Sequence, residues 1–357
     1  MADSKSKAYA EAGVDIDLAE NLLDQAKPYL KKAVRKESLG NIGGFGGFFD
    51  ISKITLDHPI LVSSTDSVGT KVSVAKMAGD FRTLGADIVN HCCNDVAVCG
   101  AEPLYFLDYY ATTRLNEHYV PLLKGLAKAC VDGNVALVGG ETAELPGVYT
   151  EGECDLVGTI VGAVDKKRIL TGDAVRKGDV VIGLQSSGLH TNGFSLARKI
   201  FFKDLGLTVD DKLPGANIKL GTALLKPHVN YSPFLVQALK QFNKGAQFKS
   251  RKDNQIFGAA HITGGGFTGN IPRVLPDNCD VVINTQAWKP LPVFRAMAET
   301  GSVSFDELYE VFNMGIGMVI VVAEESAENI SQLAAKFGHK AYRIGEVVKG
   351  AGEVQLV

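Results

Sequence analysis

Short apolar runs that end in glycine and small polar residues recur along this chain, and they constrain its fold more than any other feature. The run at 60–62 leads into 63–71, which reads SSTDSVGTK. Runs at 135–138 and 180–184 end in GGETAE and SSGLHTNG. Apolar runs of this length predict buried strands. Because helical stretches follow several of them, the pattern predicts an α/β fold, of the α+β type, with sheets covered by helices.

The length and charge of the chain narrow this further. With 357 residues it is long enough for about two domains. A polar stretch at 166–176 separates an N-terminal domain, 1–168, from a C-terminal mixed-sheet α/β domain, 169–357. The hydrophobic content of 46% is that of a soluble globular protein, and the net charge of -3 gives no reason to expect a nucleic acid or an acidic membrane as partner.

The cysteines and the N-terminus indicate a compartment. The six cysteines match neither a CxxC zinc pattern nor a dense disulfide framework, which favours buried thiols in a reducing environment. Residues 1–7 contain no apolar leader, and no apolar run approaches the length of a membrane span. We therefore expect a cytoplasmic protein.

The end of the first strand combines groups that suit a metal-bound polyphosphate. Asp66 offers a carboxylate, Thr70 a hydroxyl and Lys71 an ammonium group within six positions. A polar turn with a helix cap is the alternative for this segment alone. The glycine loop that precedes it could bring backbone N–H groups against phosphates, although a plain linker has the same composition. Its candidate contacts are Gly43, Gly44, Phe45, Gly46 and Gly47.

The stretch 85–100 predicts a helix with an unusual polar stripe. At helical spacing its apolar residues form one face, while Asn90, His91, Asn94 and Asp95 lie on or beside the opposite one. Buried polar side chains need partners. A metal–phosphate cluster would supply them, and so would an internal hydrogen-bond network.

Three acids in separate segments complete the residue-level interpretation. Asp66, Asp95 and Glu141 each follow or flank an apolar element beside glycine or asparagine. Mg²⁺ bound with a nucleotide takes one or two carboxylates plus phosphate oxygens. These residues therefore predict an enzyme that uses ATP and Mg²⁺.

Two loops in the second half are candidate ligand sites. Each enters a helix with small polar groups and glycines, the geometry of an anion site at a helix N-terminus. A lone histidine in such a loop is more often structural, but here its Ser-Ser-Gly and Asn-Gly neighbours favour a ligand site. The candidate residues are Ser187, His190, Thr191, Asn192 and Ser195 in the first loop, and Thr263, Gly264 and Gly265 in the second.

Long motifs in a fixed order resemble one family. They are AYAEAGVDID (8–17), GGFGGFF (43–49), TDSVGTK (65–71), NHCCNDVAVCGAEPLYFLDYYA (90–111), LVGGETAELPGVY (137–149), SSGLHTNGFSLARKI (186–200), HITGGGFTGNIPRVLPD (261–277) and FNMGIGM (312–318). On these motifs the chain is similar to the phosphoribosylformylglycinamidine cyclo-ligases, also called aminoimidazole ribonucleotide synthetases.

The resemblance implies a fold and a reaction. It implies a homodimer in which the N-terminal sheets of two subunits form a barrel. It also implies ring closure of formylglycinamidine ribonucleotide to aminoimidazole ribonucleotide, with ATP phosphorylating the formamide oxygen. Carried over residue by residue, it makes Asp66, Asp95 and Glu141 metal ligands and Asn94 and Lys71 part of the ATP site. It also makes the His190 loop the substrate side and the loop at 263–266 part of the same cleft. His190 is the expected proton-transfer group, with Asp95 and Lys71 as further catalytic residues.

Two departures from the family pattern and several rival functions bear on this assignment. Ser67 replaces a glycine, which would strain the backbone if the position needs positive φ. The family's Pro-Thr-Arg-x-Tyr is PHVNY at 227–231. A selenophosphate synthetase would carry a cysteine near the glycine loop, and a hydrogenase-maturation relative would end in cysteine. Two further rivals are a thiamine-phosphate kinase and a catalytically silent nucleotide-binding protein.

Overall fold

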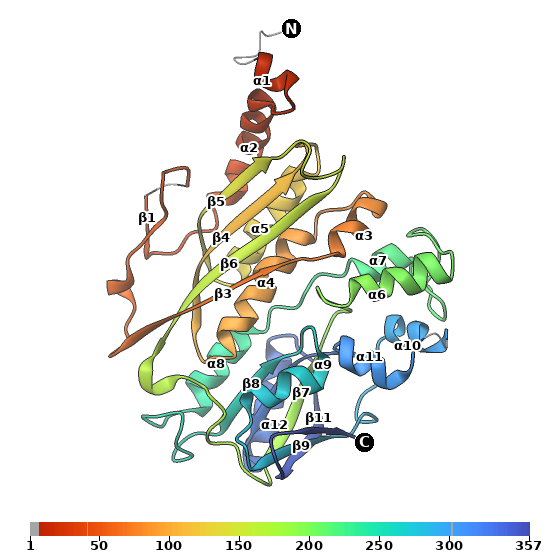
Figure 1. Cartoon of the computed structure of the whole chain (residues 1–357). Coiled ribbons are helices and arrows are strands. Elements are labelled where there is room, and N and C mark those ends of the chain that lie inside the picture. Colours follow the sequence, from red (N-terminus) through yellow and green to blue (C-terminus); the bar gives the residue numbers. More distant parts are fainter. Residues whose placement is uncertain (1–6, 41, 301–302) are drawn as a thin grey trace.

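The computed structural model describes residues 7–40, 42–300 and 303–357, which form two large sheets with their helices and one two-stranded sheet, β1-β2 (Figure 1). The N-terminal elements and the C-terminal elements lie one above the other, with α4 and α8 where they meet. Residues 1–6, on which the expected lack of a leader mostly depends, lie outside the described part of the chain.

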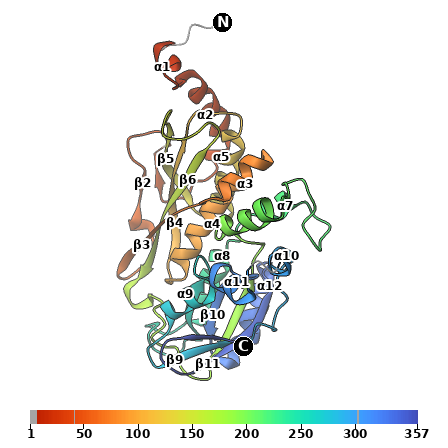
Figure 2. The ribbon, with the colours of Figure 1, turned by 45° about the vertical axis from the view of Figure 1, so that its right-hand side comes forward.

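The N-terminal sheet has four strands in the order β3-β6-β4-β5. β6 pairs antiparallel with both β3 and β4, and β5 runs parallel to β4. Helices α4 and α5 cover one face of this sheet, as Figures 1 and 2 both show. The elements are α1 (Lys7–Glu11), α2 (Ile16–Leu30), β1 (Ser38–Leu39), β2 (Phe48–Phe49), η1 (Ile51–Lys53), β3 (Pro59–Ser67), α3 (Lys71–Ala78), α4 (Leu84–Ala97), β4 (Glu102–Thr112), α5 (Tyr119–Asp132), β5 (Ala136–Glu144), β6 (Cys154–Asp165) and η2 (Lys166–Arg168).

Two glycines let α4 and α5 cross closely. A β-carbon added at Gly85 would lie 2.3 Å from the carbonyl oxygen of Leu122, and one added at Gly125 would lie 2.3 Å from that of Arg82. No side chain fits at such separations, so the two helix backbones touch where these glycines lie. This contact fixes α4 over the sheet, with Ile88 and Val96 buried toward β6.

The C-terminal sheet has six strands in the order β12-β9-β11-β7-β10-β8, and only the β12–β9 pair is parallel. The expected mixed sheet is therefore present. Its elements are β7 (Val180–Gln185), α6 (Phe194–Arg198), the π-helical turn η3 (Lys199–Asp204), α7 (Leu220–Leu224), α8 (Ser232–Phe242), β8 (Ile256–His261), α9 (Gly266–Asn270), η4 (Ile271–Val274), β9 (Cys279–Ile283), α10 (Pro292–Glu299), α11 (Phe305–Val311), β10 (Ile316–Val322), η5 (Glu324–Ser326), α12 (Ala327–Lys336), β11 (Ala341–Lys349) and β12 (Val354–Leu356).

One predicted helix is divided in the structure. The sequence predicts a helix over 222–243 with interruptions at its prolines. Instead α7 ends at Leu224, residues 226–231 have no regular secondary structure, and α8 begins at Ser232 with Pro233 in its first turn. Pro227 disfavours helical backbone at the residue before it, whereas a proline in the first turn is tolerated. The segment 226–231, which we call the bridging segment, lies against α4.

The bridging segment makes α4 a helix shared by both sheets. One face of α4 packs on β6, and the opposite face contacts α8 and the bridging segment.

Among the described residues, no helix is both long enough and apolar enough to cross a membrane.

Candidate active site

Two predicted acids meet two histidines where the sheets adjoin. Asp66 lies near the end of β3, and His91 and Asp95 lie one helical turn apart on α4. His91 Nε2 is 2.9 Å from Asp66 Oδ2 and 3.4 Å from Asp95 Oδ2. His261, the last residue of β8, places its Nδ1 2.7 Å from Asp95 Oδ1. The N-terminal acids and a C-terminal histidine therefore form one cluster.

The electrostatics of this cluster are set by those contacts. Burial alone lowers the pKa of His91, but hydrogen bonds to Asp66 and Asp95 outweigh it and raise the pKa to about 9. Burial raises the pKa of Asp95, yet its bonds to His261 and His91 hold the pKa well below its usual range. The side chains of Asp66 and Asp95 are 44% and 25% exposed, so both carboxylates still reach solvent.

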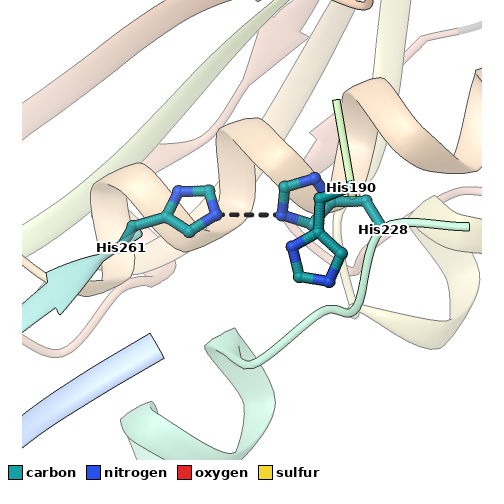
Figure 3. A group of neighbouring side chains, drawn as sticks. All are labelled: His190, His228 and His261. Carbon is teal, nitrogen blue, oxygen red and sulfur yellow. Dashed lines mark hydrogen bonds between the residues drawn. The ribbon is translucent and has the colours of Figure 1, made fainter. Parts of the chain in front are cut away.

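Three histidines of the C-terminal part lie together beside these acids (Figure 3). His228 Nε2 and His261 Nε2 are 2.9 Å apart, and the His190 and His228 rings stack with centroids 4.0 Å apart. All three are buried, and burial lowers the pKa of each. His228 belongs to the bridging segment, at the position where this chain departs from the family's Pro-Thr-Arg-x-Tyr.

His190 occupies a different environment from the one its sequence context suggested. Its φ is +64°, an uncommon value outside glycine, and its side chain is 1% exposed. Its Nε2 accepts hydrogen bonds from the backbone N–H groups of Ser187 at 3.3 Å and Val229 at 3.5 Å. The expected role rested on a pKa near the ordinary value, whereas burial holds the pKa far below it. His190 therefore stays neutral and connects its loop to the bridging segment.

Lys71 does not face an open cleft. Its ammonium group is fully buried, 2.8 Å from Asp87 Oδ2, and donates to the carbonyl oxygens of His190 at 3.0 Å and Lys226 at 2.8 Å. Burial lowers the pKa of Lys71 and raises that of Asp87, while their mutual attraction opposes both shifts. This placement does not agree with the expectation that Lys71 contacts phosphates, because its donors are engaged within the protein.

Asn94 is likewise part of the interior. Its Nδ2 donates to the carbonyl oxygen of Val229 at 2.8 Å, and its Oδ1 accepts from the N–H of Tyr231 at 2.8 Å. Asn90 Nδ2 donates to the carbonyl oxygen of His228 at 2.7 Å. For these residues the polar stripe of α4 forms an internal hydrogen-bond network, the alternative that the sequence also allowed, and both polar atoms of Asn94 take part in it.

The turn after β3 lies against the His190 loop. Thr70 Oγ1 and Ser195 Oγ are 3.1 Å apart. Ser67 Oγ accepts the N–H of Gly69 at 3.2 Å, and Gly69 itself has a φ of +55°. Ser67 is a strand residue without positive φ, so replacement of the family's glycine creates no strain of that kind. The segment 67–70 is therefore a formed turn at the junction of the two parts.

The second substrate loop also reaches this junction. A β-carbon at Gly264 would lie 3.3 Å from Asn192 Oδ1, and one at Gly266 would lie 1.8 Å from the carbonyl oxygen of Tyr309, so the loop approaches both closely. Asn270 Nδ2 donates to the carbonyl oxygens of residues 263, 264 and 266 and holds the loop in shape. The exposed Gly264 and Gly265 and the half-buried Thr263 thus lie beside the His190 loop.

Glu141 and the glycine loop lie elsewhere. Asp66, Gly158, Asp108 and Gly140 pair across the sheet in one row, so their side-chain directions share the face that packs on α4. Glu141 is the next residue along β5 and points to the opposite face. Within one chain it therefore does not join Asp66 and Asp95 in a metal site.

The loop at 43–47 lies near the β5 edge, at the other side of the sheet from β3. A β-carbon at Gly47 would lie 2.6 Å from the carbonyl oxygen of Val138, a residue of β5. Every residue of this loop is exposed, including Phe45. The loop is therefore close to Asp66 in sequence but distant from it in the folded chain.

Asp108 is a carboxylate that the sequence patterns did not single out. It occupies the same sheet row as Asp66, on β4, and burial raises its pKa to about 7. Its signal was present in the sequence, because an acid in the middle of the aromatic strand LYFLDYY is unusual for a residue that faces a core. Asn270 carried no comparable signal, since its partners are carbonyl groups of a loop.

The fold and the site together define an AIR synthase related protein with two domains. Residues 52–164 match the model of the AIR synthase related protein N-terminal domain, and residues 176–357 match that of the C-terminal domain. Phosphoribosylformylglycinamidine cyclo-ligases from Bacillus cytotoxicus and Bacillus mycoides are each 44% identical to the chain over 348 residues, 97% of either protein. The chain belongs to the phosphoribosylformylglycinamidine cyclo-ligase family, and it is a ligase of purine biosynthesis.

Solved structures share the fold at much lower identity. A hydrogenase maturation protein HypE in complex with ATP aligns with a TM-score of 0.66 and 19% identity, covering 95% of this chain and 90% of that one. Thiamine-monophosphate kinase from Stenotrophomonas maltophilia aligns with a TM-score of 0.63 and 16% identity, covering 96% of both. These likenesses establish the architecture, and the 44% identity separates the family from such relatives.

Proposed function

We propose that this enzyme closes the imidazole ring of aminoimidazole ribonucleotide from formylglycinamidine ribonucleotide, using ATP. The observation that carries the proposal is the convergence of Asp66 and Asp95 with the two substrate loops at the junction of the sheets. ATP would supply the phosphoryl group that turns the formamide oxygen into a leaving group. The amidine nitrogen then attacks that carbon, phosphate leaves, and the nitrogen loses a proton.

The chain's own contribution is orientation and charge. Ring closure within one molecule depends on holding the two reacting ends together, a gain that positioning alone can make large. Ser187, Asn192 and Thr263 keep exposed or half-buried polar groups at the junction and would bind the ribonucleotide. The buried His190 and Thr191 would fix the loop that carries them.

The phosphates would bind on the other side of the junction. Thr70 and Ser195 present hydroxyl groups 3.1 Å apart, and the exposed Gly264 and Gly265 present backbone close by. Lys71 and Asn94 are left out of this assignment because their polar groups are bonded inside the protein.

The residues fit a divalent cation in part. Asp66 and Asp95 keep solvent-exposed carboxylate oxygens on one face, the ligand number that Mg²⁺ bound with a nucleotide takes from a protein. These two side chains would hold Mg²⁺, which neutralises charge on the phosphates. Glu141 does not belong to this set within one chain.

A homodimer would give the remaining predicted residues a role. The sheet face opposite α4 carries apolar and aromatic side chains such as Leu61, Val157 and Tyr109, and Glu141 points to the same side. A second copy packed on this face would form the expected barrel and bring its own 43–47 loop to the pair. We expect this dimer in the cytoplasm, where the six free cysteines would stay reduced. Analytical ultracentrifugation checks it, and a monomer at micromolar concentration would contradict it.

The activity can be tested directly. Purified protein with formylglycinamidine ribonucleotide and Mg-ATP should yield an arylamine that diazo coupling detects, with one phosphate released per product. Thiamine monophosphate, offered in a parallel reaction, should not be phosphorylated. Absence of the arylamine while ATP still binds would support a catalytically silent nucleotide-binding protein instead.

A further inference from the structure

His228 stands where the family pattern has threonine, and its ring lies inside the junction of the two domains. The residue is 1% exposed. Its Nε2 is 2.9 Å from His261 Nε2, the contact drawn in Figure 3, and its Nδ1 is 3.4 Å from Thr191 Oγ1. We propose that His228 is a positioning residue, which orients His261 and through it the carboxylate of Asp95, one of the two carboxylates that would hold Mg²⁺.

The backbone of His228 is held on both sides. Its N–H donates to Asp87 Oδ1 at 2.7 Å, and its carbonyl oxygen accepts from Asn90 Nδ2 at 2.7 Å. Asp87 and Asn90 belong to α4, the helix that also carries Asp95. The His228 ring stacks on that of His190, with centroids 4.0 Å apart. The ring therefore enters the junction from a backbone that α4 itself fixes, and its stacking restricts rotation.

One arrangement of protons satisfies the contacts of the two rings. The carboxylate of Asp95 only accepts hydrogen bonds, so His261 Nδ1, which is 2.7 Å from Asp95 Oδ1, carries a proton. Both rings are buried, which disfavours the imidazolium form. A neutral His261 has a free electron pair on Nε2, so His228 Nε2 donates to it. The hydroxyl group of Thr191 then donates to His228 Nδ1.

These hydrogen bonds run in one direction, from the substrate loop to Asp95. His228 fixes the rotation of the His261 ring, and His261 in turn donates to Oδ1 of Asp95. Asp95 Oδ2 accepts from Ser64 Oγ at 3.1 Å, so each carboxylate oxygen has its own partner. The partners thereby set the plane that the carboxylate presents to an ion. Loss of a residue that supports a metal ligand typically costs 10–100-fold in metal affinity or activity.

A threonine at position 228 would not make these contacts. Its hydroxyl group lies on the β-carbon, whereas His228 uses both nitrogens of its ring to bridge His261 and Thr191. The next residue, Val229, is half-buried against apolar side chains and offers no polar group in their place. In this chain the departure from the family pattern therefore changes which side chain supports Asp95.

The inference rests on the proposed function, because Asp95 acts in turnover only if the enzyme binds ATP with a divalent ion there. Two measurements that need no turnover keep the inference separate from that function. One reads the protons on the histidine rings, and the other reads the affinity for a divalent ion.

Nitrogen-15 NMR of the full-length protein, labelled in its histidine rings, locates the protons directly. The ring signals are assigned by comparison with His228→Gln and His261→Gln. In the wild type without metal or nucleotide, we expect the proton of His228 on Nε2 and that of His261 on Nδ1. His228→Thr should shift the signal of His261 Nε2, which loses its donor, and should leave the signals of His118, outside the cluster, unchanged.

Mn²⁺ measures ion binding without turnover, because it takes oxygen ligands as Mg²⁺ does. The free ion is followed by electron paramagnetic resonance during a titration in the presence of excess ADP. His228→Thr should weaken Mn²⁺ binding about 10–100-fold and lower kcat by a similar factor. His228→Gln keeps an N–H group that can donate to His261 and should retain more of the affinity. His118→Gln should bind Mn²⁺ as the wild type does.

The wild-type spectrum alone can overturn the proposal, since a proton on Nδ1 of His228 would mean that this ring does not donate to His261. The proposal also fails if folded His228→Thr binds Mn²⁺ like the wild type, or if the wild type binds none. Far-ultraviolet circular dichroism establishes folding, and where the variant does not fold, the wild-type spectrum decides. The expected protons and Mn²⁺ affinities without any arylamine would contradict the proposed function and leave the role of His228 standing.

Discussion

The polar stripe of α4 divides into a closed group and an open group, although both lie on one helix. The closed group, Asp87, Asn90 and Asn94, is bonded to Lys71 and to the backbone of the bridging segment. The open group, His91 and Asp95, contacts Asp66 and His261 beside solvent-exposed carboxylate oxygens. The difference teaches that a polar residue on a buried helix serves structure or chemistry according to what the other domain brings against it.

Among the predicted effects, removal of the Lys71 ammonium group should be the largest, and it should lower the free energy of unfolding by leaving the closed group without its cation. Lys71→Met leaves the carboxylate of Asp87 buried without its cation, which costs about 3–5 kcal/mol. Urea unfolding checks this value. The double variant Lys71→Met, Asp87→Leu should recover most of the loss, because no buried charge then remains. A loss below about 1 kcal/mol would mean that the closed group is not structural.

Asp95→Asn should act on turnover instead. Loss of one charged ligand beside the phosphates should lower turnover about 10²–10³-fold, an effect larger than the loss of unfolding free energy that follows when His91 and His261 lose their charged partner. The substitution keeps the shape and one oxygen for His261. Asp132→Asn, on the exposed surface of α5, is the matched control. If turnover stays within threefold of the wild type, Asp95 does not belong to the open group.

Asp108 tests the importance of the imidazole partners. It lies in the same sheet row as Asp66, but burial raises its pKa to about 7. A carboxyl group with a raised pKa destabilises the folded state as pH rises from about 4 to 7, because the folded state holds its proton longer. In metal-free protein, Asp108→Asn should therefore equal the wild type at pH 4 and exceed it by about 2–4 kcal/mol at pH 8. If the variant and the wild type have equal unfolding free energies at both pH values, the pKa of Asp108 is not raised in the folded protein.

The hydroxyl pair that joins the two domains should show the smallest effect. Thr70 and Ser195 lie 3.1 Å apart at an exposed position, where a hydrogen bond contributes roughly 0.5–1.5 kcal/mol. A double-mutant cycle with Thr70→Val and Ser195→Ala should give a coupling energy near the lower end of that range. The same variants should raise the KM for ATP, since both hydroxyls belong to the proposed phosphate side. An unchanged KM would confine the pair to a structural role.

Much of the fold was predictable because it depends on local patterns. Apolar runs marked the strands, and the helical period of 85–100 predicted α4 with both ends within three residues. The prediction of one helix over 222–243 was wrong at its centre, where Pro227 disfavours helical backbone and the bridging segment bonds to side chains of α4 instead. Patterns in one segment cannot reveal partners in another.

The site was predictable to a lesser degree for the same reason. Residue type and neighbouring glycine identified Asp66, Asp95 and the His190 loop, which do converge. They could not place Glu141, because one step along β5 reverses the face to which a side chain points. Nor could they show that Lys71 pairs with a buried carboxylate. A lysine at a strand end that binds phosphate has the same sequence pattern as one that pairs inside the protein.

The sharing of α4 between the domains has a consequence for the order of events during synthesis. The ribosome completes the N-terminal sheet and α4 well before His261 and the bridging segment emerge, and domains fold as units from the N-terminus onward. Until then Asn90 and Asn94 lack their partners, and Asp95 lacks His261. The active site of the nascent chain is therefore incomplete, and the enzyme can become active only after the C-terminal domain has folded against α4.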